Sequence, residues 1–78
     1  MTETQAEQPS TSDGLIDRLR GEIAAAPSRS LQGILLHEVG VLHENAGEEP
    51  LAARDYLAAY HADAEFREPL DALVRFLS

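Results

Sequence analysis

Residues 36–64 read LHEVGVLHENAGEEPLAARDYLAAYHADA. Within this stretch, large and small side chains recur at the spacing of helical turns, once before Gly47 and once after it. We call these residues the packing row: Leu36, Val39, Gly40, His43, Ala52, Tyr56 and Ala59. Large residues set opposite small ones allow two helices to interdigitate. The packing row therefore predicts two helices joined by a turn at Gly47 and packed as a tight antiparallel pair.

Gly40 stands in the middle of the first of these two helices. A glycine in that position costs about 0.5–1 kcal/mol relative to alanine, so a packing reason is expected for it. Without a side chain, Gly40 lets the second helix approach closely. We expect the two helices to cross there, with the ring of Tyr56 filling the space beside the glycine.

The apolar periodicity of the remaining chain predicts two further helices and no strand. The four predicted helices cover residues 13–26, 29–46, about 50 to 61 or 62, and about 68 onward. Pro27 ends the first helix, and Ser28 or Ser30 can cap the second. The predicted fold is all-α, a short antiparallel helical hairpin or solenoid fragment within residues 13–78. Residues 1–12 are polar and acidic, with little to bury, and are predicted to be a disordered tail.

Composition excludes several classes of function. The net charge of −8 argues against binding to nucleic acid or to an anionic membrane surface, because both require basic patches. No run of apolar residues is long enough to span a membrane, and the N-terminus lacks the features of a signal peptide. We therefore expect a cytoplasmic protein. The chain has no cysteine, which removes disulfides and thiolate metal sites.

The packing row resembles the tetratricopeptide repeat, which has a period of about 34 residues and the pattern W-x2-L-G-x2-Y, A-x3-F, P. Its residues fall on the family positions in order, and Asp63-Ala64 falls where that repeat closes with Asp-Pro. Two positions depart from the pattern, because His43 replaces an aromatic residue and Ala64 replaces the proline. One period later, the same positions hold Leu70, Leu73, Val74 and Leu77. The resemblance implies one full repeat, half of a second, and a leading helix that does not keep the register.

This resemblance implies a protein–protein interaction scaffold. In the family, the first helix of each repeat lines a concave groove that binds a peptide or a partner protein. The corresponding positions, which we expect to bind the partner, are Ile34, His37, Val41, Glu44, Glu68, Asp71 and Arg75. A groove lined this way would be half apolar and half acidic, and would suit a peptide with an apolar anchor and a basic flank. The family's chaperone-binding lysines and asparagine are missing, so that activity is not implied.

The histidines do not form a recognisable metal site. His37-Glu38 begins like the H-E-x-x-H motif of zinc proteases, but Val41 stands where the second histidine is required. We expect His43 to be a partly buried packing residue, with His37 and His61 on the surface. With neither a cysteine nor a patterned serine, the sequence offers no nucleophile and base in a recognisable arrangement. We therefore expect no enzyme activity, no metal and no cofactor.

Two other functions remain open. Acyl carrier proteins are also acidic, helical and of this length, and carry a phosphopantetheine arm on a serine in a Ser-Leu pair. Ser30-Leu31 opens a predicted helix, but Arg29 stands where that family has aspartate. The other function is a small acidic inhibitor or antitoxin that masks a basic partner, which the net charge permits.

The last predicted helix also predicts self-association. A helical repeat cannot bury its apolar face without a stacked neighbour. This helix presents a cluster of large apolar side chains with no helix after it to cover them: Leu70, Leu73, Val74, Phe76 and Leu77. We expect the isolated chain to form oligomers through this cluster, or else to depend on further C-terminal sequence.

Overall fold

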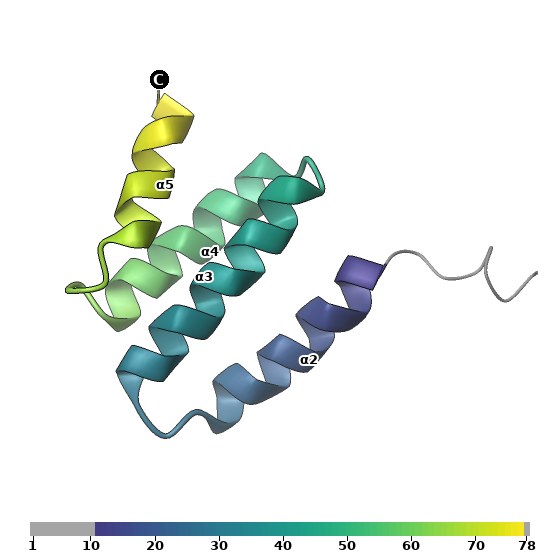
Figure 1. Cartoon of the computed structure of the whole chain (residues 1–78), viewed down its shortest axis with the longest axis vertical. Coiled ribbons are helices and arrows are strands. Elements are labelled where there is room, and N and C mark those ends of the chain that lie inside the picture. Colours follow the sequence, from purple (N-terminus) through teal and green to yellow (C-terminus); the bar gives the residue numbers. More distant parts are fainter. Residues whose placement is uncertain (1–10, 78) are drawn as a thin grey trace, which may run out of the picture.

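A computed structural model describes the backbone of residues 11–77, which form helices and no strand (Figure 1). The helices are α2 (Thr11–Ala25), α3 (Arg29–Asn45), α4 (Glu49–Ala62) and α5 (Glu68–Leu77). The predicted all-α hairpin fold is confirmed. Most of the predicted tail, residues 1–12, lies outside the described residues; only Thr11 and Ser12 are described, as the first residues of α2.

The ends of α3 follow from its capping residues. The side chain of Ser28 accepts a hydrogen bond from the backbone N–H of Leu31, so Ser28 is the N-cap, one of the two predicted candidates. At the other end, Gly47 has a φ of 81°, in the left-handed region that favours glycine. The N–H groups of Gly47 and Glu48 donate to the carbonyls of Glu44 and His43, which is the Schellman arrangement. The turn at Gly47 then leads directly into α4.

The helices pack in chain order. The antiparallel hairpin of α3 and α4 forms the centre, with α2 against α3 and α5 against α4 (Figure 1). α2 and α5 lie on opposite sides of this hairpin, so they do not close a core between them. The radius of gyration is 13.8 Å, against roughly 11 Å for a compact domain of this length. The described chain is an extended layer of helices.

The two central helices approach most closely at Gly40. A Cβ atom on Gly40 would lie 2.6 Å from Cε1 of Tyr56, so the tyrosine ring occupies the space of a side chain there. Gly33, earlier on α3, makes a second close approach, because a Cβ atom on it would lie 3.3 Å from the carbonyl oxygen of Ala59. The sequence predicted the first approach and missed the second.

The packing row lies at the α3–α4 contact. Of its seven residues, Leu36 is half-buried and the others are buried: Val39, Gly40, His43, Ala52, Tyr56 and Ala59. Tyr56 and Ala52 continue into a cluster with Ala72 of α5. Val41, Leu73 and Phe76 pack around this cluster, so α5 is held to the hairpin by apolar contacts.

Candidate functional site

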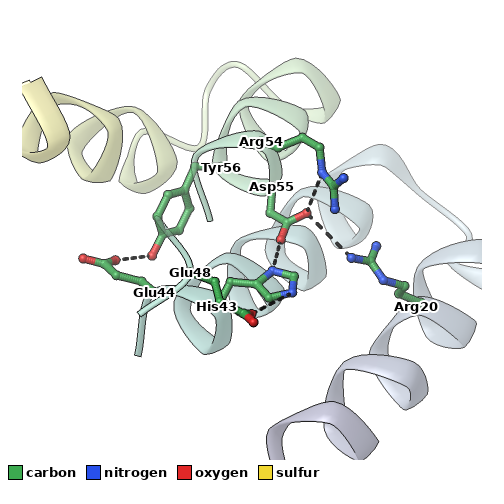
Figure 2. Close-up of polar contacts among 7 residues, drawn as sticks. All are labelled: Arg20, His43, Glu44, Glu48, Arg54, Asp55 and Tyr56. Atoms are coloured by element: carbon green, nitrogen blue, oxygen red, sulfur yellow. Dashed lines mark hydrogen bonds and ion pairs between the residues drawn. The ribbon is translucent and has the colours of Figure 1, made fainter. Parts of the chain in front are cut away.

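Three side chains from three helices meet at the edge of the apolar cluster. Tyr56 of α4 donates its hydroxyl to Glu44 Oε1 of α3 at 2.6 Å (Figure 2). Arg75 of α5 donates to the same carboxylate, at 2.9 Å to Oε2 and 3.4 Å to Oε1. This carboxylate therefore ties α5 to both helices of the hairpin, and it satisfies the hydroxyl of an otherwise buried tyrosine.

The charges of this cluster follow from its contacts. The hydrogen bonds from Arg75 and then from Tyr56 lower the pKa of Glu44, which keeps the carboxylate ionised. Burial and then the hydrogen bond to Glu44 raise the pKa of Tyr56 to about 12. The hydrogen bond to the same carboxylate raises the pKa of Arg75. The negative charge of Glu44 is therefore already paired with the positive charge of Arg75 within the chain.

His37 is not on the surface, so that prediction is wrong. Its side chain is only 15 % exposed, and its ring centroid lies 5.1 Å from that of Tyr56 and 5.3 Å from that of Phe66. Its Nε2 is 3.8 Å from the carboxylate of Glu68 at the start of α5, while its Nδ1 is buried with no hydrogen-bond partner. His37 is half-buried because α5 and the segment before it fold back over α3. His61 is exposed, as predicted.

The seven predicted partner-binding residues divide into two groups. Ile34 is 46 % exposed, and Glu68, Asp71 and Arg75 are exposed as well. The others are half-buried and contact α4 or α5: His37, Val41 and Glu44. The contact of His37 with Glu68 and the ion pair of Glu44 with Arg75 bring α3 and α5 next to each other on this side of the molecule.

Two exposed residues of α3 complete this surface and were missed. Leu31 and Glu38 lie three residues before and four residues after Ile34, so they share its side of the helix. Helical periodicity could have found both. We define the α3–α5 face as the surface formed by Leu31, Ile34, Glu38 and Val41 of α3 with Glu68, Asp71 and Arg75 of α5.

A buried polar pair joins the other side of the hairpin. His43 Nδ1 lies 2.5 Å from Asp55 Oδ2, and both side chains are buried (Figure 2). Arg20 of α2 reaches the same carboxylate at 3.9 Å, and Glu48 lies 3.9 Å from the other ring nitrogen of His43. His43 is buried as predicted, but Asp55 was not expected to be its partner. The pair connects α2, α3 and α4 from within the packed interior of the hairpin.

Ser30, the residue considered for a carrier arm, has a contact within the chain. Its hydroxyl donates to Asp63 Oδ2 at 3.0 Å, and its neighbour Arg29 donates to the carbonyls of Ala62 and His61. These bonds hold the first turn of α3 to the end of α4. The Ser30 side chain is exposed.

The residues predicted to self-associate are all on α5. Leu77 is 87 % exposed and Val74 is 53 % exposed. Leu70, Leu73 and Phe76 are half-buried, and the last two pack against the cluster around Tyr56. α5 therefore uses part of its apolar surface within the chain and leaves part of it facing outward.

Several other kinds of site are missing from the part of the chain that the structure describes. Residues 11–77 contain no pocket and no group of three acids or histidines arranged to hold a metal ion. No helix among them has the length and apolar character needed to cross a membrane. Comparison of the chain with protein-family models, curated proteins and solved structures finds no match.

Proposed function

We propose that this chain is a tetratricopeptide-like interaction module that binds a peptide or partner protein on the α3–α5 face. The observation that supports the proposal most is the pairing of α3 with α5. In the tetratricopeptide pattern that the sequence resembles, α3 and α5 correspond to the first helices of successive repeats. The bonds between Glu44 and Arg75 hold the two helices together. The tight crossing at Gly40 keeps α4 behind α3, so the exposed side chains of α3 stay available.

The chemistry of this face suggests what the partner carries. Leu31 and Ile34 form an exposed apolar area on α3. Glu38, Glu68 and Asp71 are exposed acids around it, whereas Arg75 is paired with Glu44. A partner segment with an apolar anchor and flanking arginines or lysines would match both features, because burial of the anchor supplies affinity and the charges supply orientation.

A fluorescence-anisotropy screen would test the proposal. The probe is a set of labelled peptides with one central leucine flanked by arginines, and the control set carries glutamates in place of the arginines. We expect binding of the basic set only. Ile34→Asp should weaken it roughly tenfold or more, since a charge would replace the apolar contact. Leu57→Asp is the matched control, because Leu57 is 48 % exposed but lies on α4, outside the face. Binding that survives Ile34→Asp would contradict the proposal.

The same experiment separates this function from that of an acidic inhibitor. A protein that masks a basic partner through charge alone would lose affinity steeply with added salt and would be insensitive to Ile34→Asp.

The carrier function is separated by the intact mass of protein made in its native host. A phosphopantetheine mass on Ser30 would support a carrier, whereas we expect the unmodified mass and no bound metal or cofactor.

A further inference from the structure

Glu44 is a partly buried carboxylate that the chain holds in one orientation. Its side chain is 25 % exposed, and its Oε1 accepts the hydroxyl of Tyr56 at 2.6 Å (Figure 2). Tyr56 is fully buried, so its hydroxyl has little freedom to move. The bond to Tyr56 engages only one of the two carboxylate oxygens, which leaves the other for a second donor.

In this structure the second donor is a guanidinium. Arg75 Nη1 donates to Oε2 of Glu44 at 2.9 Å. Arg75 Nη2 lies 3.4 Å from Oε1, the oxygen that already accepts from Tyr56. The first distance is that of a good hydrogen bond and the second is long. Arg75 therefore occupies the carboxylate without making the two short parallel bonds of the strongest arginine–carboxylate pairs.

Arg75 is placed where another cation can replace it. It lies in the last turn of α5, and its side chain is 60 % exposed. An exposed ion pair contributes little to stability, because water solvates both charges when they separate. If Arg75 left, Glu44 would keep its bond to Tyr56. The carboxylate would then remain oriented for a new donor.

We propose that Glu44 is the receptor for an arginine of the partner, and that Arg75 occupies this receptor in the unbound chain. The inference rests on the proposed function, because the carboxylate borders the α3–α5 face through Arg75. Arginine fits better than lysine, since its planar fork matches the two oxygens of a carboxylate. Arg75 is then an intramolecular competitor, which the partner displaces on binding.

The positions of Ile34 and Glu44 set the spacing of the side chains that the partner presents. The two residues are about 15 Å apart along α3, at a rise of about 1.5 Å per residue. An extended segment covers that distance with about four to five residues, each about 3.3 Å long. A leucine seated on Ile34 therefore brings an arginine about four to five positions away to Glu44.

Fluorescence anisotropy with the full chain and labelled peptides measures this exchange. The probe peptide carries one leucine and one arginine about five positions apart, and the control peptide carries citrulline, a neutral residue of similar shape, in place of arginine. We expect Arg75→Gln to tighten binding of the probe roughly fivefold, because it removes the competitor. Glu44→Gln should weaken binding of the probe to the level of the citrulline peptide. Circular dichroism checks that both variants are folded.

Two comparisons separate this exchange from a general effect of charge. Arg67→Gln removes the same charge at an exposed position just before α5, and should change the affinity far less than Arg75→Gln. In a Glu44→Gln background, Arg75→Gln should no longer tighten binding, because the two arginines have no carboxylate left to compete for. Equal gains from Arg67→Gln and Arg75→Gln, or a gain that persists without Glu44, would overturn the inference.

The same variants distinguish a failure of this inference from a failure of the proposed function. Binding that is lost with Ile34→Asp but unchanged by Glu44→Gln and Arg75→Gln would overturn the arginine receptor alone, and would still support binding on the α3–α5 face. If neither the natural chain nor the Arg75→Gln variant bound the probe, both proposals would be overturned.

Discussion

At the level of single residues, the space beside Gly40 leaves no room for a side chain. Even an alanine there would place its Cβ 2.6 Å from Cε1 and 2.7 Å from Cδ1 of Tyr56. The ring cannot retreat easily because it is fully buried. We expect Gly40→Ala to destabilise the chain by about 1–3 kcal/mol, a large part of the stability of a domain this small. Thermal unfolding followed by circular dichroism measures the change.

Gly21 provides the matched control for that substitution. It also lies inside a helix, but a Cβ on it would meet nothing within 4 Å. Gly21→Ala should therefore stabilise the chain by about 0.5–1 kcal/mol through helix propensity alone. If both substitutions shifted the unfolding midpoint in the same direction, the close crossing at Gly40 would not explain why a glycine stands there.

Tyr56 gives a pH dependence whose sign follows from its burial. Its pKa in the folded chain, about 12, lies above the ordinary value of 10.0, so folding favours the protonated phenol. The corresponding stability is complete below pH 10.0 and is lost as the pH rises from there towards about 12. The chain has two tyrosines and no tryptophan, so Tyr60→Phe leaves Tyr56 as the only tyrosine.

Absorbance at 295 nm in the Tyr60→Phe variant follows the ionisation of Tyr56 directly. We expect its midpoint well above that of an ordinary tyrosine for as long as circular dichroism shows folded helices. Glu44→Gln should move the midpoint down, because it removes the carboxylate charge that opposes ionisation of the phenol. An ordinary midpoint in a folded chain would contradict the burial of the Tyr56 hydroxyl against Glu44.

Helix ends were the part of the structure that the sequence predicted best. Pro27 and Gly47 mark the ends of helices because one restricts the backbone before it and the other tolerates a positive φ. The crossing at Gly40 was predictable for a similar reason, since a glycine in mid-helix requires a local explanation. Such signals lie within one or two turns of the chain.

Contacts between helices were harder to predict. The burial of His37 depends on α5 and Phe66 folding back over α3, and no local pattern encodes that return. The pairing of His43 with Asp55 was missed because a charged residue on the inner side of α4 is unexpected without its partner. Leu31 and Glu38 of the α3–α5 face, in contrast, lie at helical spacing from Ile34 and could have been predicted from the sequence.

The pair of His43 and Asp55 is a buried polar link between α3 and α4, and its two members depend on each other. Removing one partner of a buried pair leaves an uncompensated polar group and costs about 3–5 kcal/mol. Replacing both partners by apolar residues of similar size is often close to neutral. We therefore expect Asp55→Leu to be far more destabilising than His43→Leu/Asp55→Leu, as measured by urea unfolding. Equal costs would show that the pair contributes only through packing.

At the scale of the whole molecule, sequential packing predicts a gradient of stability along the chain. Each outer helix packs mainly against one helix of the central hairpin, so α2 and α5 can each open without the other. α3 and α4 share the closest contacts, including the approach at Gly40. Local opening should therefore cost least at the two ends and most in the hairpin.

Hydrogen exchange followed by mass spectrometry tests this gradient. We expect the slowest exchange in α3 and α4 and faster exchange in α2 and α5. Arg75→Ala should speed exchange in α5 and leave α2 unchanged, because it removes only the bonds from α5 to Glu44. The effect should be small, since an exposed ion pair contributes about 0–1 kcal/mol. Uniform exchange across α2, α3, α4 and α5 would mean that the described helices unfold as one cooperative unit despite their open arrangement.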